Sequence, residues 1–236
     1  MLVKSEGIIF RTTKYGETSV VAEIFSPDYG LNSYIIGSVR KKKSKLASIV
    51  QVLNIVEFVS YYKDNSSLSR IKEIQLHLVY NDFPFNVVKS SLGLFLTEIC
   101  QKALRKIDQP GEVYHFIKRT FLALDQSTES LAHFHITFLI DLSSYLGFGL
   151  TNNYDPSAPY FNLQNGVFCG VYEDPKYDLG RETSESLHWY LSGQNHASIN
   201  RDQRKRVLAA LIDFFRYHIE DFGQIRSLDV IYSLYE

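Results

Sequence analysis

The chain has 236 residues, of which 45% are hydrophobic and 14% aromatic, so it can fold around a core and does not have a disordered composition. No apolar run reaches the roughly 18 residues of a membrane helix, and the first residues lack the apolar stretch of a signal peptide. Two cysteines, Cys100 and Cys169, are too few for a disulfide framework or a four-thiolate zinc site. We therefore expect two free thiols in a reducing cytoplasm.

The formal net charge of -1 is unevenly distributed along the chain. Residues 1–80 carry a net charge of +4, whereas residues 81–236 carry a net charge of −5. Positive charge is densest in the stretch GSVRKKKSKL, residues 37–46, where five of ten side chains are cationic. This asymmetry indicates two modules with different partners.

Residues 1–80 have the pattern of a small β-barrel. Ser19–Phe25 is β-branched and apolar, and Glu73–Leu78 alternates strictly between polar and apolar residues. We expect five strands, near residues 4–13, 17–26, 30–38, 51–62 and 68–79, with one helical turn at 46–49. Five short strands with an insertion after the third fit a Greek-key barrel of the OB type, and an SH3-like barrel is the structural alternative.

Residues 81–236 have the three-to-four-residue apolar spacing of amphipathic helices. We expect helices near residues 88–107, 113–124, 131–146, 183–192 and 200–222, the first stopped by residues 108–111 and the last capped by Asn200. The predicted fold class is therefore α+β, with an OB-type barrel domain over 1–80 followed by an all-α domain over 81–236.

An irregular insertion, residues 149–182, interrupts the predicted helical domain with three prolines and four glycines. Apolar residues flank an Asn165-Gly166 pair within it. Because Asn-Gly favours a tight turn, we expect a small hairpin around Gln164–Gly166.

We find no pattern that predicts catalysis. His133 and His135 are two residues apart on a predicted helix, so their rings point about 200° apart and cannot easily share a metal. We expect one to pack and the other to face water. Phosphate-binding loops and nucleophile elbows are absent, carboxylates are scattered, and Cys169 has no histidine nearby. We predict no catalytic residue, no cofactor and no metal.

The basic stretch admits two interpretations, a solvated surface loop or a patch that binds phosphates. Its position on a positively charged barrel, beside the loops with which OB folds bind oligonucleotides, favours phosphate binding. The candidate residues are Arg40, Lys41, Lys42, Lys43 and Lys45, with Arg11 and Lys14 as further candidates. Exposed rings among Tyr15, Tyr29, Tyr34, Tyr61 and Tyr62 could stack on bases.

Several segments resemble RecO, a family of bacterial recombination mediators. The resemblance lies in Glu6–Thr18, Phe25–Leu31 and Gly37–Leu46, and more weakly in Leu146–Phe148 and Ser227–Ile231. It implies an N-terminal OB domain and a C-terminal helical domain that together bind single- and double-stranded DNA and anneal complementary strands. It also implies partnership with RecR and single-stranded-DNA-binding protein, indirect action on RecA, no catalytic residue, and a cytoplasmic, nucleoid-associated location.

The chain departs from this family at one place. Many members carry a four-cysteine zinc site after the Leu-Gly-Phe helix, but residues 151–161 here contain no cysteine. Something other than four thiolates must stabilise this segment.

The resemblance also implies that the helical domain docks the acidic, apolar-ended tail of single-stranded-DNA-binding protein. Four cations near the start of the last predicted helix are candidate partners for its carboxylates, namely Arg201, Arg204, Lys205 and Arg206.

Two other functions compete with that of a non-enzymatic DNA-binding mediator. One is a general OB-fold module for RNA binding or translation, which strand annealing would distinguish. The other is an enzyme with its site in the helical domain, which would show turnover abolished by a single carboxylate or histidine substitution.

Overall fold

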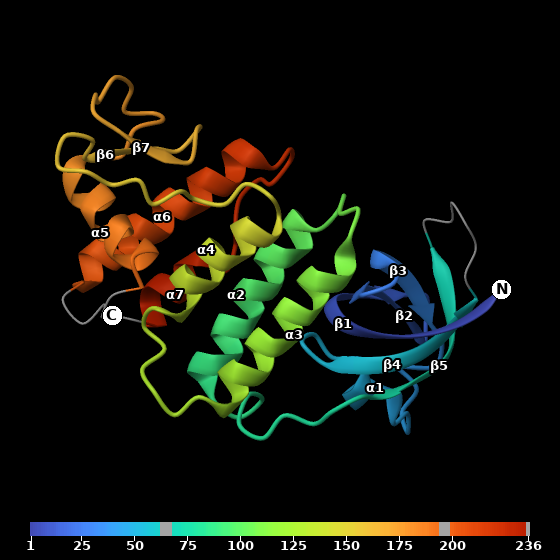
Figure 1. The fold of residues 1–236 in the computed structure, drawn as a ribbon. Coiled ribbons are helices and arrows are strands. Elements are labelled where there is room, and N and C mark those ends of the chain that lie inside the picture. Colours follow the sequence, from blue (N-terminus) through green and yellow to red (C-terminus); the bar gives the residue numbers. More distant parts are fainter. Residues whose placement is uncertain (62–67, 194–198, 235–236) are drawn as a thin grey trace. The chain divides into compact units, whose positions relative to one another are not determined.

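The computed structural model describes residues 1–61, 68–193 and 199–234. The chain divides into two compact units, Met1–Ser127 and Thr128–Glu236. The first unit contains a closed five-stranded barrel and two long helices, and the second contains further helices and a two-stranded sheet (Figure 1). The predicted α+β class and OB-type barrel are confirmed. The predicted division after residue 80 follows the change from strands to helices and stays a prediction.

The barrel strands are β1 (Leu2–Tyr15), β2 (Ser19–Ser26), β3 (Gly30–Ile36), β4 (Ile55–Tyr61) and β5 (Ser69–Leu76). The long β1 pairs with β4 through its first half and with β2 through its second half, while β3 runs parallel to β5 and closes the barrel. The fourth strand begins at Ile55 and not at residue 51 as predicted, because residues before it turn and Leu53 has a φ of +79°.

Helix α1 (Leu46–Ile49), the predicted single turn, closes one part of the barrel core. The core is made of inward-facing side chains such as Ala22, Tyr34 and Phe58, each buried. Leu46 and Ile49 of α1 pack against it. The segment between β3 and β4 is therefore tied to the barrel through apolar contacts at its end.

The longer helices are α2 (Val87–Ala103) and α3 (Pro110–Gln126) in the first unit, and α4 (Phe134–Tyr145), α5 (Arg181–Leu191), α6 (Arg201–His218) and α7 (Leu228–Leu234) in the second. Asn200 caps α6 in a capping box with Gln203, as its position predicts. Helix α2 ends at Ala103, before the predicted stop at residues 108–111. Pro110 instead begins α3, because proline suits a first turn whose N–H groups have no helical partner. Helix α7 was not predicted.

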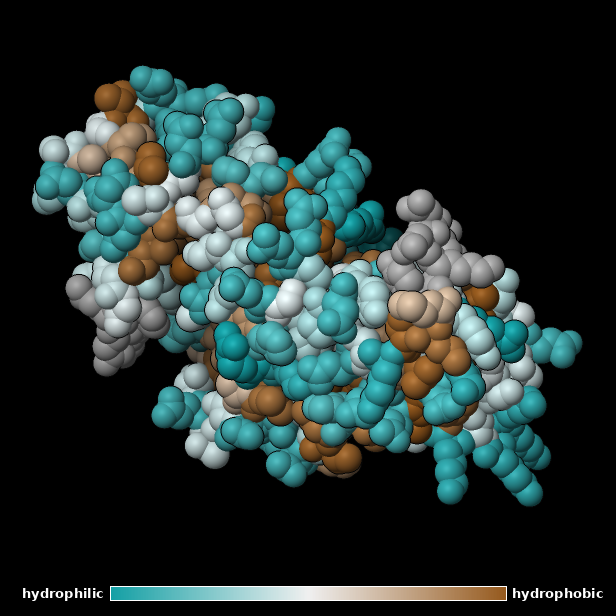
Figure 2. Space-filling view, turned by 45° about the vertical axis from the view of Figure 1, so that its right-hand side comes forward, coloured by the Kyte–Doolittle hydropathy of each residue, from teal (hydrophilic) through white to brown (hydrophobic). Residues whose placement is uncertain are grey.

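The face shown in Figure 2 is largely hydrophilic, with hydrophobic patches between polar side chains. No helix within the described ranges is both long and apolar enough to cross a membrane.

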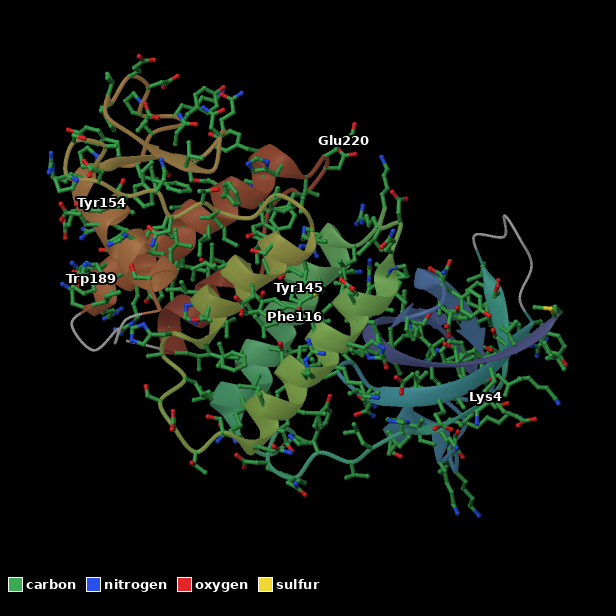
Figure 3. The ribbon with its side chains drawn as sticks, in the orientation of Figure 1. Lys4, Phe116, Tyr145, Tyr154, Trp189 and Glu220 are labelled. Atoms are coloured by element: carbon green, nitrogen blue, oxygen red, sulfur yellow. The ribbon has the colours of Figure 1, made fainter. Side chains whose placement is uncertain are left out.

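The predicted hairpin in the insertion is present as β6 (Tyr160–Asn162) and β7 (Val167–Cys169). Asn162 pairs with Val167, so a longer loop than a two-residue Asn-Gly turn joins the strands. Gly166 has a φ of +69°, a conformation that favours glycine, and Phe161 and Phe168 pack edge to face across the strands. Tyr154, labelled in Figure 3, stacks on His188 of α5 with ring centroids 4.3 Å apart.

A buried carboxylate, that of Asp178, organises the insertion. Asp178 accepts hydrogen bonds from the backbone N–H groups of Glu173 (2.8 Å) and Asp174 (3.0 Å) and from the Asn162 side chain (2.6 Å). Burial alone would raise the pKa of Asp178, but these hydrogen bonds outweigh it and the pKa is lowered. The segment is thus held by a charged acceptor and by aromatic packing.

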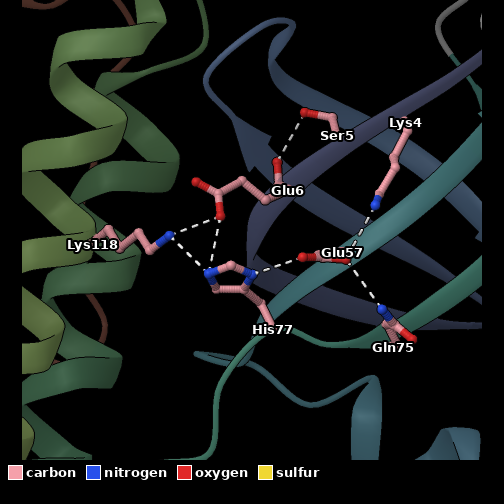
Figure 4. Close-up of polar contacts among 7 residues, drawn as sticks. All are labelled: Lys4, Ser5, Glu6, Glu57, Gln75, His77 and Lys118. Carbon is pink, nitrogen blue, oxygen red and sulfur yellow. Dashed lines mark hydrogen bonds and ion pairs between the residues drawn. The ribbon is translucent and has the colours of Figure 1, made fainter.

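In the first unit, α3 contacts the barrel through a cluster of charged side chains (Figure 4). Lys118 Nζ lies 2.7 Å from Glu6 Oε2, and His77 Nε2 lies 3.3 Å from the same oxygen. The other imidazole nitrogen of His77 is 3.1 Å from Glu57. The hydrogen bond from His77, aided by Gln75 and Lys4, lowers the pKa of Glu57.

The junction between β5 and α2 is fixed by Asp125, near the end of α3. Its carboxylate accepts hydrogen bonds from the backbone N–H groups of residues 81, 82 and 83, at 3.0, 2.9 and 2.8 Å. Lys89, itself buried, donates to the Asp125 carbonyl oxygen at 2.8 Å and lies 2.7 Å from Asp82 Oδ2. Burial by itself would raise the pKa of Asp125, but the three amides and Lys89 outweigh burial and lower it.

We predict that Asp125→Asn destabilises the protein by about 1–3 kcal/mol, because an amide provides one neutral acceptor where three N–H groups, that of Phe83 buried, bind a carboxylate. Chemical denaturation of the wild type and the variant measures the difference. Asp108→Asn, at an exposed position in the same unit, is the control and should stay within about 0.5 kcal/mol of the wild type.

The free energy of unfolding of the wild type and that of Asp125→Asn should depend differently on pH. The folded-state pKa of Asp125 lies below the unfolded value of about 3.9, so its contribution is complete above that value and is lost as the pH falls through the folded-state pKa. The stability gap should therefore hold from neutral pH to about pH 5 and narrow below about pH 4. A gap that stays constant down to pH 2.5 would contradict this account of Asp125.

Candidate nucleic-acid interface and basic pocket

The basic loop, residues Gly37–Lys45, is fixed to the barrel at both ends. At its start Val39 is buried, and the backbone N–H of Arg40 donates to the Thr18 carbonyl at 2.9 Å. The Arg40 guanidinium donates to the Gly16 carbonyl at 3.1 Å, in the turn between β1 and β2. At its end the chain enters α1, whose Leu46 packs on the core. The backbone of the loop is therefore placed by the fold.

The lysines of the basic loop point into solvent. Lys41, Lys42, Lys43 and Lys45 are all exposed, and none of them forms an ion pair with another described residue. The loop backbone turns between Lys41 and Ser44, with a hydrogen bond of 2.9 Å from the Ser44 N–H. The fold thus gathers unneutralised cations on one short turn, as an anionic chain would require.

The two further candidates, Arg11 and Lys14, differ in their surroundings. Arg11 Nη1 lies 3.6 Å from Glu23 Oε1 on the neighbouring strand, and Glu23 also accepts from Gln101 of α2 at 2.6 Å. Its charge is therefore partly compensated by an acid. Lys14 is exposed near the end of β1, close in sequence to the turn that Arg40 contacts. Arg11 is thus paired with an acid, whereas Lys14 is exposed two residues before the turn glycine that Arg40 contacts.

The tyrosines considered as stacking rings separate into buried and exposed. Tyr34 is 1% exposed and packs on Phe58 inside the barrel, so the expectation that it is available to a base is wrong: its position on β3 points inward. Tyr15 and Tyr61 are exposed to 49% and 48%, and Tyr29 is half-buried. Tyr62 lies outside the described residues.

Arg70 is a cation of this surface that sequence reasoning missed. Arg70 is exposed at the start of β5 and is paired with Ile35 of the parallel strand β3. A guanidinium nitrogen of Arg70 lies 3.9 Å from where a side-chain carbon on Gly37 would be, at the root of the basic loop. Alternation in the sequence marks Arg70 as outward-facing, but its neighbour comes from a distant parallel strand that no local pattern identifies.

The second unit contains a pocket built largely from residues that the sequence singled out. Helix α6 contributes Arg201, Arg204, Lys205 and Leu208, which its periodicity places on one face. The pocket is completed by His135 of α4 and by Ile231 and Tyr232 of α7. Lys205 Nζ lies 4.8 Å from the centre of the Tyr232 ring. The pocket therefore combines an apolar floor with a cationic rim.

Within this pocket His135 is an uncharged group. It is 2% exposed, and burial, with smaller contributions from His133 and Arg204, lowers the pKa of His135 to about 3. The positive charge of the rim thus comes from arginine and lysine and does not vary with pH near neutrality. Of the histidine pair, His135 packs as expected, whereas His133 is half-buried and lies 2.6 Å from the Tyr190 hydroxyl, not facing water.

Arg206 does not belong to the pocket. Its guanidinium pairs with Glu182 of α5, because the residue directly after Lys205 points to another side of the helix. Arg204 is partly engaged by the Ile199 carbonyl, to which it donates at 3.0 Å. Of the four predicted cations, the structure therefore brings three together. The wall from α7 was missed because its seven residues are too short for a clear period.

Within the described ranges of the chain, no group of three or more histidine, cysteine, aspartate or glutamate side chains is placed to hold a metal. Burial raises the pKa of Cys100 far above its ordinary value, and the pKa of Cys169 is raised as well, so neither thiol is activated as a nucleophile.

Comparison with known proteins assigns both parts of the chain. The family model described as "Recombination protein O N terminal" matches residues 1–80, and the model described as "Recombination protein O C terminal" matches residues 84–229.

Curated relatives carry the same family name. The DNA repair protein RecO of Bacteroides fragilis is 32% identical over 251 aligned residues, and that of Phocaeicola vulgatus is 29% identical over 248, with the whole of each chain covered. The RecO protein of Azobacteroides pseudotrichonymphae is 25% identical, again over both full lengths. The barrel, the helices and these matches together place the chain in the RecO family of DNA repair and recombination proteins.

Proposed function

We propose that this protein is a non-enzymatic recombination mediator that binds single- and double-stranded DNA and anneals complementary strands. In this proposal it cooperates with RecR, binds the tail of single-stranded-DNA-binding protein, and helps load RecA onto DNA that is coated by single-stranded-DNA-binding protein. It would act at the bacterial nucleoid, in the cytoplasm. The observation that carries the proposal is the basic loop, whose unpaired lysines are fixed to an OB-type barrel in a member of the RecO family.

Phosphate binding by this loop follows from elementary electrostatics. Closely spaced cations displace the counterions condensed on a nucleic acid, and this release favours binding without reading sequence. Annealing requires that both strands be held by their backbones while their bases remain free to pair. A phosphate-binding loop meets that requirement, whereas a site that enclosed the bases would not.

Annealing of two complementary strands, each coated by single-stranded-DNA-binding protein, tests the proposal directly. We expect the protein to accelerate annealing without consuming a nucleotide. An RNA pair provides the contrast: faster annealing of RNA than of DNA, or no annealing of either, would reject a DNA mediator. Nucleotide hydrolysis or strand cleavage that is lost on changing a single carboxylate or histidine would identify an enzyme instead.

We predict that Lys42→Ala/Lys43→Ala weakens binding to every DNA sequence alike and makes its salt dependence shallower. If all five cations of the loop neutralised a phosphate, log affinity would fall with log salt at a slope of about −3.5 for single strands, so removing two should change the slope by about 1.4. Fluorescence anisotropy between 50 and 200 mM salt measures this change.

The matched control is Lys4→Ala/Lys72→Ala, which removes the same charge from the same barrel. Lys4, labelled in Figure 3, lies 3.5 Å from Glu57, and Lys72 lies 3.2 Å from Glu73, so both are already paired with acids. The control should leave the slope nearly unchanged. If both double variants reduced the slope equally, net charge and not the loop would govern binding, and thermal melting would show whether either had unfolded.

We also propose that the pocket of α4, α6 and α7 binds the acidic, apolar-ended tail of single-stranded-DNA-binding protein. The supporting observations are its cationic rim, the buried Leu208 and Ile231 beneath it, and its neutral histidine. An apolar C-terminal side chain would contact the floor, and its carboxylate would pair with Arg201 or Lys205.

For this pocket we predict that Arg201→Ala and Lys205→Ala each weaken binding of such a peptide about tenfold or more, as loss of a charge-assisted hydrogen bond would. Titration calorimetry with the full chain measures affinity, and a peptide with an amidated C-terminus should bind more weakly. Arg206→Ala is the control on the same helix, because Arg206 pairs with Glu182 outside the pocket. Equal losses for Arg206 and Lys205 would assign the effect to the overall charge of α6.

A further inference from the structure

A row of outward-facing side chains crosses the barrel wall beside the basic loop. Strand registers place Tyr61 of β4 opposite Arg70 of β5, Arg70 beside Ile35 of β3, and Ile35 opposite Val21 of β2. Residues paired across neighbouring strands share a face of the sheet, about 5 Å apart. The inward neighbours of this row, Ser60 and Ile71, are buried, which fixes the direction of the row as outward.

The row combines three kinds of surface. Tyr61 and Arg70 are exposed, and Ile35 and Val21 are partly exposed between them and β1. Arg70 reaches the root of the basic loop at Gly37, so the row and the loop form a continuous surface. Among the described residues neither Tyr61 nor Arg70 forms an ion pair or a side-chain hydrogen bond.

This composition differs from that of the loop, and so does the chemistry it can recognise. The loop has charges but no ring, so it can attract phosphates of single and double strands alike. The row has an aromatic face, an aliphatic floor and one cation. An aromatic ring can stack on a base only when the base is unstacked, which holds in single strands and not within a duplex.

We infer that Tyr61 and Arg70 form a single-strand-selective subsite, in which a base stacks on Tyr61 over the floor of Ile35 and Val21 while Arg70 binds the adjoining phosphate. The inference rests on the proposed DNA-binding function and divides it between two surfaces. The basic loop supplies affinity for any DNA backbone, and the row supplies the preference for unpaired bases.

The test compares Tyr61→Val and Tyr61→Phe in the full chain. Valine keeps the β-strand propensity but removes the ring, and phenylalanine keeps the ring. We expect Tyr61→Val to lose on the order of tenfold in affinity for single-stranded DNA and nothing for duplex, with an unchanged salt slope. Tyr61→Phe should bind single strands as the wild type does. Equal loss on both DNA forms, or no loss on single strands, would overturn the inference.

An abasic oligonucleotide isolates the contribution of the base, because it presents the phosphates alone. The wild type should bind it more weakly than a normal single strand, and Tyr61→Val should bind it as the wild type does. If Tyr61→Val lowered abasic affinity by the same factor as it lowered single-strand affinity, stacking would be refuted.

Arg70→Ala tests the phosphate contact, with Lys72→Ala as its control on the same strand. We expect Arg70→Ala to make the single-strand salt slope shallower by about 0.7 and Lys72→Ala to leave it unchanged, because Lys72 is paired with Glu73. If Lys42→Ala/Lys43→Ala lost DNA binding while the Tyr61 and Arg70 variants bound as the wild type does, the subsite would be refuted and the proposed function would stand. Absence of DNA binding by the wild type would refute both.

Discussion

The first unit depends on one buried carboxylate. Asp125 receives three consecutive backbone N–H groups, from residues 81–83, at the point where the chain leaves the barrel and turns into α2. Of these residues Phe83 is buried, so its amide would otherwise lack a partner, which is costly, and the end of α3 supplies the acceptor that stabilises the turn. Lys89 balances the charge and bonds the carbonyl of the same aspartate. One side chain thereby joins the last strand of the barrel to both helices, which is why α2 and α3 belong to the same compact unit.

That arrangement decides which part of the barrel is left for a ligand. Lys118 of α3 forms an ion pair with Glu6. Glu23 is paired with Arg11 of β1 and also accepts a hydrogen bond from Gln101 of α2, so both acids of the barrel wall already have partners. Among the described barrel residues, the cations without an acidic partner include Arg70 and the four lysines of the basic loop. Arg70 lies at the root of this loop, so unpaired positive charge of the described barrel residues is concentrated there.

Sequence periodicity was sufficient for elements whose partners are local. The five strands, the turn at Leu46–Ile49 and the N-cap Asn200 follow from alternation, apolar spacing and side-chain capping, which neighbouring residues determine. Sequence periodicity was insufficient where a contact with a residue distant in sequence determines how a side chain is oriented or what surrounds it. Tyr34 was misjudged because only the closed barrel shows that its face is inward, and Arg70 was missed because its neighbour lies on a parallel strand. Only part of the pocket was predicted from the sequence. The cations of α6 were recognised, but α7 was not, because its helical form depends on packing and not on a long apolar period.

The insertion is connected to the pocket through α6. With no thiolate cluster among the residues described there, the carboxylate of Asp178 gathers the backbone of residues 173–174, and Phe161 packs on Phe168. The hairpin packs against α6, since Phe161 and Gly166 both lie close to Phe214. Asp178 accepts these hydrogen bonds most strongly while it is ionised, which is why they lower the pKa of its carboxyl group. Packing of the hairpin on Phe214 thus supports the later turns of the helix whose first turns carry Arg201, Arg204 and Lys205.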